Sequence, residues 1–121
     1  MTDGASVALV VSEDYLKRIG GEPMARFIAF SVKGVAPELM GIGPNVAIPA
    51  ALELAGLSLE QVQLIELNEA FAAQALGCMK ELNIPVELPN QVGSGISIGH
   101  PIGCTGARQV VSGLHLMQRE N

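Results

Sequence analysis

Short apolar segments alternate with helix-forming segments along this chain, and this alternation strongly limits the folds available to it. The first apolar run, Ser6–Val11, has the β-branched composition of a strand that is buried on both faces. Ala25–Lys33 and Val62–Leu67 are predicted as further strands, and Val92–Ile98 as a shorter one. The pattern predicts an α/β fold in which helices cover a mostly parallel sheet.

Capping residues and glycines predict where the helices begin and end. Ser12 is followed by two acidic residues, so a short helix is expected from there to Gly20–Gly21. Gly34–Gly43 is predicted as a loop, and the helix after it is expected to end at Gly56. Asn68 is in position to cap the next helix, and a last helix follows the glycine-rich turn near Gly106.

Two of these helices have an apolar face in their sequence. The first face is expected to comprise Phe71, Ala75, Cys78, Met79 and Leu82. The second is expected to comprise Val110, Val111, Leu114 and Met117.

Composition excludes several classes of protein. A chain of 121 residues allows little more than one domain, and its net charge of -5 with scattered basic residues disfavours nucleic-acid binding. Leu88–Ala107, although free of charge, contains too many polar residues, glycines and prolines for a membrane span. The N-terminus lacks a secretory signal, and two cysteines do not make a disulfide framework. We therefore expect a soluble, non-secreted protein of a reducing compartment.

Polar residues that can carry chemistry follow two of the predicted β segments, where open α/β sheets bind ligands. Asn68 is interpretable as a helix cap with Glu69 in the first turn, or as an amide that donates to a water or an oxyanion. His100 lies between a glycine and a proline, so its imidazole is either a positioned general base or a structural hydrogen-bonding group.

The cysteines and the glycine-rich turn around His100 offer less specific alternatives. Cys104 follows His100 by four residues, so a Cys–His pair is conceivable, but a small buried thiol is the simpler interpretation for both Cys104 and Cys78. The turn fits neither of the common nucleotide-binding glycine motifs. No second histidine or cysteine stands at ligand spacing from His100, so no metal site is predicted.

Together, the two polar motifs resemble the C-terminal half of thiolases. The resemblance is carried by Asn68–Ala72 and Gly99–Arg108, and it extends to Asp3–Ala5 and Met40–Pro44. It therefore covers essentially the whole chain. The sequence of Cys104–Val110 is most similar to that of the degradative, 3-ketoacyl-CoA type of thiolase.

This resemblance implies an acyl-CoA C-acyltransferase of fatty-acid metabolism and β-oxidation. The expected architecture is a thiolase-like layered αβα half-fold with a mostly parallel sheet, truncated at both ends. Residues 1–22 would be the last strand and helix of the N-terminal half. Residues 23–121 would be the C-terminal domain without its final strands.

The resemblance also implies roles for individual residues. His100 would activate the thiol of a nucleophilic cysteine, and a water held by Asn68 would help it to stabilise an enolate oxygen. Met40, Ala70 and Phe71 would line the acyl and pantetheine pocket. Coenzyme A and acyl-CoA would be substrates, with no permanently bound cofactor. The partners would be the remainder of the subunit or a second subunit, in a homo-oligomer.

The sequence departs from the thiolase pattern at several places. Ser94 stands where the family usually has glycine, and Val92 where asparagine is common. Neither Cys78 nor Cys104 matches a catalytic cysteine of the family, so the nucleophile is missing from these residues. The chain alone is therefore expected to be inactive.

Two other functions stay open at this point. The chain could be a non-catalytic, thiolase-like interaction module that docks on a complete subunit. It could also be a small hydrolase or acyltransferase that uses Cys104 with His100.

Overall fold

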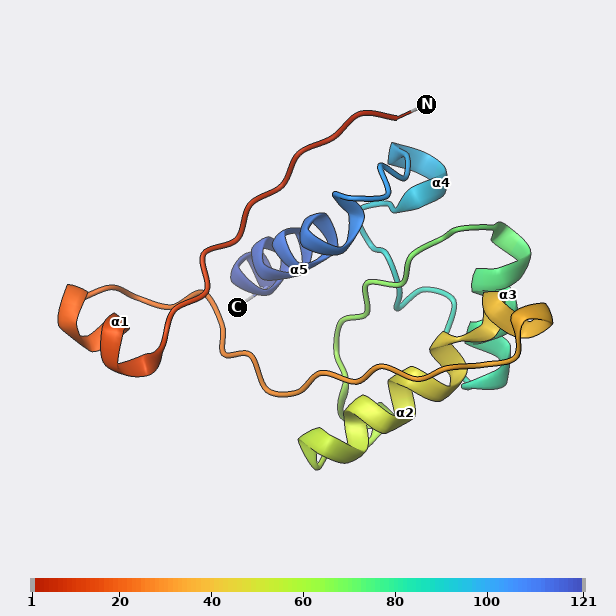
Figure 1. Cartoon of the computed structure of the whole chain (residues 1–121), viewed down its shortest axis with the longest axis horizontal. Coiled ribbons are helices and arrows are strands. Elements are labelled where there is room, and N and C mark those ends of the chain that lie inside the picture. Colours follow the sequence, from red (N-terminus) through yellow and green to blue (C-terminus); the bar gives the residue numbers. More distant parts are fainter. Residues whose placement is uncertain (1, 121) are drawn as a thin grey trace.

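Helices and extended segments alternate as predicted up to α3 (Ala72–Glu81), but the extended segments do not form a sheet (Figure 1). The computed structural model of the protein describes residues 2–120; Met1 and Asn121, the outer limits of the two predicted domains, lie outside this range. Ser6–Val11 and Ala25–Lys33 have no strand assignment. The only β bridge within residues 2–120 is a single parallel one, between Ile65 and Pro89. A mostly parallel sheet is thus not formed within this range.

Seven helical elements account for the regular structure of the described residues. They are α1 (Glu13–Ile19), the 3₁₀ helix η1 (Pro37–Ile42), α2 (Pro44–Ala55), the 3₁₀ helix η2 (Leu59–Gln61), α3 (Ala72–Glu81), α4 (Gly95–Ile98) and α5 (Thr105–Glu120).

Helix α1 confirms the predicted end signals. The Ser12 Oγ accepts a hydrogen bond from the Tyr15 backbone N–H at 3.2 Å. Gly20 ends the helix with a φ of 65°, a left-handed conformation that glycine adopts without a steric penalty. Helix α2 likewise ends at Gly56, as expected.

Two segments differ from the expected secondary structure. Gly34–Gly43, predicted as a loop, contains η1, which Pro37 starts with a helix-compatible φ. The strand predicted for Val92–Ile98 is wrong, because Gly93 turns the chain at a φ of 91° and α4 follows directly. The Ser97 Oγ accepts a hydrogen bond from the Ser94 N–H at 3.1 Å, so local hydroxyl bonds favour this helical turn.

A small core forms where α3 packs on the extended segment 62–67. It consists of Leu67, Ala75 and Cys78, and Ile65 and Met79 pack against it. The predicted α3 face is therefore mostly confirmed. Its first member, Phe71, is instead exposed.

The buried face of α5 is offset from the predicted one. Gly113 and Leu116 are buried, whereas Val110 and Met117 are exposed. A Cβ on Gly113 would lie 3.6 Å from Leu64, so the small residue brings α5 close to the segment 62–67. Local periodicity located the helix but not the side that packs.

Asn90 fastens the central extended segment to the loop that leads to α4. Its Oδ1 accepts from the Leu67 N–H at 2.9 Å, and its Nδ2 donates to the Leu67 carbonyl at 2.8 Å. Its own N–H donates to the Ile65 carbonyl at 2.9 Å. Asn90 has a φ of 57°, a conformation that asparagine tolerates better than most residues. The Asn90 side-chain amide thus makes the two hydrogen bonds to Leu67 that the backbone of a neighbouring β-strand would make.

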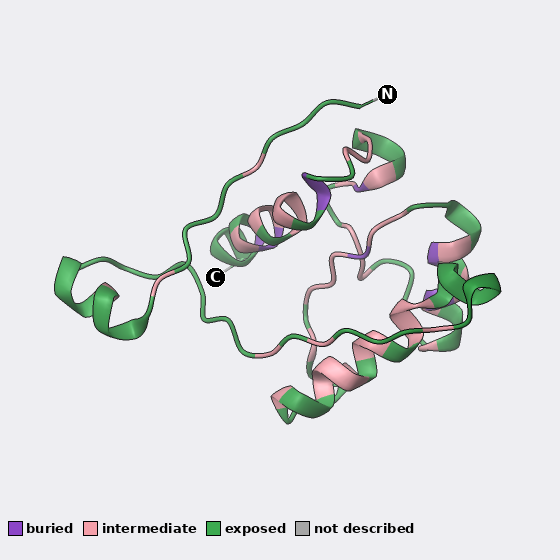
Figure 2. Cartoon of the chain, viewed as in Figure 1, coloured by how far each residue is buried: buried purple, intermediate pink, exposed green. Residues whose placement is uncertain are grey.

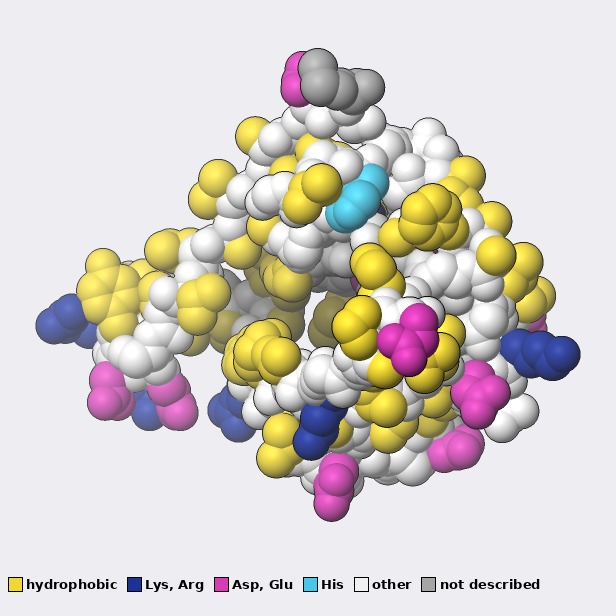
Figure 3. Space-filling view, turned by 45° about the vertical axis from the view of Figure 1, so that its right-hand side comes forward, with side chains coloured by type: hydrophobic (Ala, Val, Ile, Leu, Met, Phe, Trp, Pro, Cys, Tyr) yellow, Lys and Arg dark blue, Asp and Glu magenta, His cyan; other side chains and the backbone are white. Residues whose placement is uncertain are grey.

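Many large apolar side chains are exposed, and apolar side chains are seen across the face of the molecule in Figure 3. Figure 2 shows that the N-terminal extended segments are mostly exposed. Both faces of the first extended segment are open, with Val7 88% and Val10 83% exposed. Phe30 in the second extended segment is 71% exposed. No helix within residues 2–120 is long and apolar enough to cross a membrane. The exposure of Val7, Val10 and Phe30 shows that the two extended segments have the composition of buried strands but lie open to solvent.

This exposure predicts that the chain on its own is marginally stable or self-associates. Each large apolar side chain left in water forgoes roughly 1.5–3 kcal/mol, and a typical domain has only ~5–15 kcal/mol of net stability. Sedimentation velocity combined with urea unfolding checks the expectation. A monodisperse monomer with a free energy of unfolding well above about 5 kcal/mol would contradict it.

Asn90→Ala should destabilise the chain severely. Each partly buried partner that it leaves unsatisfied costs ~1–3 kcal/mol, and alanine in a left-handed conformation costs about 1–2 kcal/mol more. Asn90→Gly is the matched control, because it loses the same side-chain bonds but tolerates the backbone angle. Urea midpoints at one protein concentration should fall in the order wild type, Asn90→Gly, Asn90→Ala. An unchanged midpoint for Asn90→Ala would show that the amide does not hold this junction.

Candidate active site

Asn68 follows the core residue Leu67 directly and does not cap a helix. Helix α3 begins four residues later at Ala72, and its N-cap residue Phe71 has no side-chain oxygen to offer. The expectation that Asn68 caps this helix is therefore wrong. Its Oδ1 is buried and has no hydrogen-bond partner among residues 2–120. A buried amide that serves no helix end is available for another role.

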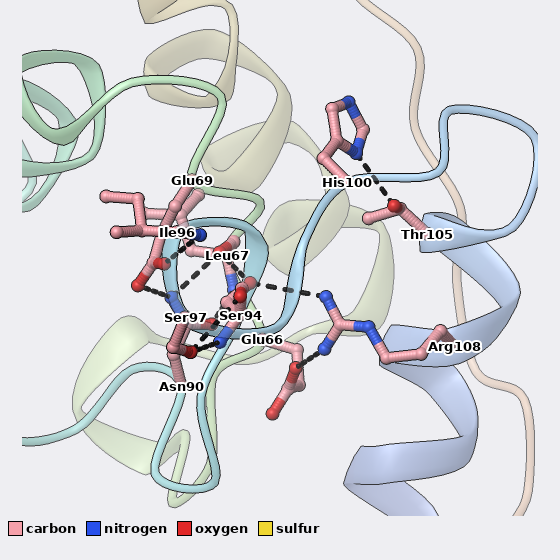
Figure 4. A network of polar contacts seen from close by, with 10 residues as sticks. All are labelled: Glu66, Leu67, Glu69, Asn90, Ser94, Ile96, Ser97, His100, Thr105 and Arg108. Carbon is pink, nitrogen blue, oxygen red and sulfur yellow. Dashed lines mark hydrogen bonds and ion pairs between the residues drawn. The ribbon is translucent and has the colours of Figure 1, made fainter. Parts of the chain in front are cut away.

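Glu69 holds the loop that leads to His100. One carboxylate oxygen accepts from the Asn90 Nδ2 at 2.9 Å, and the other accepts from the Ile96 N–H at 3.1 Å, in the first turn of α4 (Figure 4). The predicted place of Glu69 in the first turn of α3 is therefore wrong. Its negative charge instead satisfies a free N–H at the start of α4.

Gly95 lets α4 approach the Asn68 segment closely. A Cβ at this position would lie 2.9 Å from the Glu69 carbonyl oxygen and 3.4 Å from the Asn68 Oδ1. Any larger residue would push these two segments apart. The tertiary structure thus brings the Asn68 motif and the loop before His100 into direct contact.

Ser94 is fully buried and bonds to both sides of this junction. Its Oγ donates to the Leu67 carbonyl at 3.2 Å and accepts from the Arg108 Nη2 at 3.3 Å. Arg108 also forms an ion pair with Glu66, at 3.1 Å between Nη1 and Oε2. The hydroxyl therefore links α5 to the segment that carries Asn68.

His100 is half-buried in the turn between α4 and α5. Gly99, at a φ of 92°, and Pro101 flank it, and its Nδ1 lies 2.7 Å from the Thr105 Oγ1. Figure 4 shows the ring turned so that its second nitrogen points away from this contact. The imidazole therefore has one fixed nitrogen and one directed away from its partner.

The contacts of Cys104 do not favour a Cys–His pair. Cys104 is a buried free thiol, and within residues 2–120 no hydrogen bond joins it to His100. Cys78 is also a buried free thiol; it contacts the Gly41 carbonyl at 3.7 Å and thereby links α3 to η1. No group of three or more potential metal ligands is present in the described part of the chain.

The three predicted pocket residues are all exposed. Met40 in η1 is 77% exposed, and Phe71 at the start of α3 is 72% exposed. Ala70 precedes Phe71 and is exposed as well. The two segments meet where Gly41 lies against Gln74, because a Cβ on Gly41 would be 3.5 Å from that side chain. Exposed apolar side chains from η1 and the start of α3 thus belong to contacting elements.

An open cleft of about 430 Å³ lies between residues 2–6 and the turn formed by residues 101–104. Asp3, Gly4 and Cys104 are among its lining residues. It places the Asp3–Ala5 motif against the turn that follows His100.

Sequence reasoning did not single out Asn90 or Thr105. Asn90 lay in a segment predicted only as a connection, and a positive φ at a non-glycine residue is weakly encoded in a single sequence. Thr105 lay inside a quoted motif, but its contact with His100 depends on how the turn folds. The one available signal was the position of a hydroxyl residue at a predicted helix start.

The buried Glu66 gives the chain a defined pH dependence. Burial raises the pKa of the Glu66 carboxyl above its ordinary value of 4.5, and this outweighs the lowering by the Arg108 guanidinium. Because the native state binds the proton more tightly, this group's stabilising contribution is complete below pH 4.5 and is lost as the pH rises through the raised pKa. Glu66→Gln should therefore gain stability relative to wild type as the pH rises through the raised pKa of Glu66.

Glu60→Gln is the control for this experiment. A hydrogen bond with Ser58 lowers the pKa of the exposed Glu60 carboxyl, so its contribution is present above the ordinary pKa and is lost on acidification, the opposite sign. Urea unfolding of the three proteins across acidic and neutral pH checks both slopes. A pH-independent difference between Glu66→Gln and wild type would refute the assignment.

Comparison with known proteins places these motifs in a family. Residues 21–121 match the family described as thiolase, C-terminal domain. The 3-ketoacyl-CoA thiolase of Bacillus subtilis is 47% identical over 120 residues, which cover 99% of this chain and 31% of that protein.

Solved structures agree with the sequence match. The acetyl-CoA acetyltransferase of Bacillus anthracis superposes with a TM-score of 0.88 at 51% identity, covering 90% of this chain and 28% of that one. The human mitochondrial 3-ketoacyl-CoA thiolase in complex with CoA gives a TM-score of 0.87 at 41% identity, covering 89% and 27%. The chain thus spans less than a third of the length of these relatives. Its motifs, its match over residues 21–121 and its backbone together show that the chain belongs to the thiolase family and has the thiolase-like fold of its C-terminal domain.

Proposed function

We propose that this chain supplies the C-terminal part of a thiolase active site, which transfers acyl groups to coenzyme A. The environment of the Asn68 side chain is the observation that carries the proposal. Its buried Oδ1 has no partner among residues 2–120, and its amide is not used to cap α3. The polar contacts of Glu69 and Asn90 hold that segment against the loop that leads to His100. Such a held amide is suited to orienting a water beside a reacting oxygen.

In this proposal His100 is the general base. It takes the thiol proton of a cysteine that lies outside these 121 residues, and the thiolate forms a C–S bond to the keto carbon of a 3-ketoacyl-CoA. The carbon–carbon bond breaks, and its electron pair moves to an enolate oxygen. The water held by Asn68 and the protonated His100 stabilise that oxygen until the proton returns to carbon. The cysteine is left as an acyl thioester. The thiol of coenzyme A then attacks the thioester carbon, so the acyl group leaves as acyl-CoA and the cysteine thiol is restored.

The exposed apolar residues near η1 have a place in the same proposal. Met40, Ala70 and Phe71 would contact the acyl chain or the pantetheine arm, since side chains of this kind line most small-molecule sites. Coenzyme A and acyl-CoA are substrates, and no permanent cofactor is required. The human relative in complex with CoA supports this choice of ligand.

The extended segments, which form no sheet within residues 2–120, support a further part of the proposal. Segments 6–11, 25–33 and 62–67 would pair as strands of a mostly parallel αβα sheet when the remaining thiolase segments or a second subunit are present. Residues 1–22 would then belong to the end of the N-terminal half, and residues 23–121 to the C-terminal domain, in a homo-oligomer. The compartment would be the cytoplasm of a bacterium, or the peroxisome or mitochondrion of a eukaryote.

A complementation assay tests the proposed reaction. The chain would be co-expressed with the Bacillus subtilis relative from which only the matching region has been removed, and thiolysis of a short 3-ketoacyl-CoA by this pair would be measured. We expect no turnover by the chain alone and turnover by the pair. His100→Ala should lower kcat by about 10²- to 10⁴-fold, the usual contribution of a general base. Asn68→Ala should lower it as well.

His115→Ala is the matched control, because His115 is an exposed histidine of α5. Full turnover by His100→Ala in the complemented pair would refute the role of His100. Turnover by the isolated chain would place a nucleophile within these residues and make Cys104 the next position to replace. A folded pair that never turns over would favour the interaction module, whose supporting observation is the exposed apolar surface.

A further inference from the structure

The Thr105 hydroxyl makes two polar contacts at the start of α5. Its Oγ1 lies 2.7 Å from the His100 Nδ1 and 3.1 Å from the Pro101 carbonyl oxygen. Thr105 is 3% exposed, so water does not compete for these contacts. Figure 4 shows the contact with the ring directly.

Counting protons assigns a direction to both contacts. A threonine hydroxyl has one proton to donate, and a carbonyl oxygen can only accept. The hydroxyl proton therefore goes to the Pro101 carbonyl, which is the common bond of a threonine to the residue four before it. The Oγ1 then has only lone pairs to offer to His100. Both contacts are satisfied when the neutral ring carries its proton on Nδ1.

The backbone of the turn keeps this geometry in place. The Pro101 carbonyl also accepts from the Cys104 N–H at 2.8 Å and from the Thr105 N–H at 3.0 Å. The turn therefore fixes where the Thr105 hydroxyl lies relative to His100. The opposite assignment, with the hydroxyl donating to an unprotonated Nδ1, would leave the 3.1 Å contact with Pro101 without a proton.

We propose that Thr105 is a positioning residue that holds neutral His100 as its Nδ1–H tautomer. The lone pair of the ring then lies on Nε2, the nitrogen directed away from Thr105. This inference rests on the proposed role of His100 as a base, and it names the atom that accepts the proton. A hydrogen bond to one imidazole nitrogen commonly sets the state of the other in this way. One hydrogen bond of ordinary net strength shifts the ratio of tautomers by about two- to tenfold.

NMR of the ¹⁵N-labelled 121-residue chain tests the proposal without any enzyme assay. Long-range ¹H–¹⁵N correlation of the histidine rings, recorded at a pH where they are neutral, shows which nitrogen bears the proton. We expect the Nδ1–H pattern for His100, with the exposed His115 as the internal reference for a solvated ring. An Nε2–H pattern for His100 in the wild-type chain would overturn the proposal, because it would mean that the hydroxyl donates to the ring.

Two variants separate the effect of the Thr105 hydroxyl on the His100 tautomer from the effect of the size and shape of the Thr105 side chain. Thr105→Val removes the hydroxyl at nearly the same volume and should shift His100 toward the Nε2–H tautomer. Thr105→Ser keeps the hydroxyl and should restore the Nδ1–H pattern. Retention of the Nδ1–H pattern in a folded Thr105→Val chain would refute the role of Thr105. Should Thr105→Val fail to fold, the wild-type and Thr105→Ser spectra still decide the question.

Kinetics of the complemented pair separate this inference from the proposed function. Thr105→Val should lower kcat by up to about tenfold and leave KM unchanged, and Thr105→Ser should recover kcat. Full activity of His100→Ala would remove the proposed function while leaving the tautomer measurement valid. Loss of activity in His100→Ala with unchanged kcat in Thr105→Val would remove only the role of Thr105.

Discussion

The side-chain amide of Asn90 pairs with both backbone groups of Leu67, and the arrangement of the candidate site depends on this pairing. The amide donates and accepts as a neighbouring strand would, at 2.8 and 2.9 Å. It therefore holds the central extended segment in place where no sheet is formed within residues 2–120. Asn68 and Glu69 follow directly from Leu67, so their positions are set by the same two hydrogen bonds. Glu69 then extends the connection to the first turn of α4.

From this junction, two separate sets of contacts position the two proposed catalytic groups. Asn68 lies beside Gly95, where the lack of a side chain allows close approach. His100 is fixed from the opposite direction, by Thr105 at the start of α5. Arg108 joins the two sets, because it reaches both Glu66 and Ser94 from α5. The Ser94 hydroxyl thus supplies one of the bonds between them.

Local end signals were reliable where the interactions that they describe are themselves local. Ser12 and Gly20 bound α1 as expected, since a side-chain oxygen three residues before an N–H and a left-handed glycine depend on nothing distant. The same logic failed at Asn68, because α3 begins only at Ala72 and Phe71 occupies its N-cap position. Val92–Ile98 failed for a different reason, because a glycine with positive φ and two serine hydroxyls outweighed a weak apolar pattern.

By itself, the sequence determined the order of helices and extended segments, the two polar motifs and the resemblance to thiolases. These properties follow from residue type and short spacing, which act over one or two turns of chain. Only the tertiary structure decided which nitrogen of His100 is engaged, which residue holds the Asn68 segment and which face of α5 is buried. Such features depend on hydrogen bonds and packing between residues up to 42 positions apart, as in the Arg108–Glu66 pair, and no local pattern encodes a partner at that distance. Strand pairing is the extreme case, because an extended segment has no hydrogen-bond partner within itself.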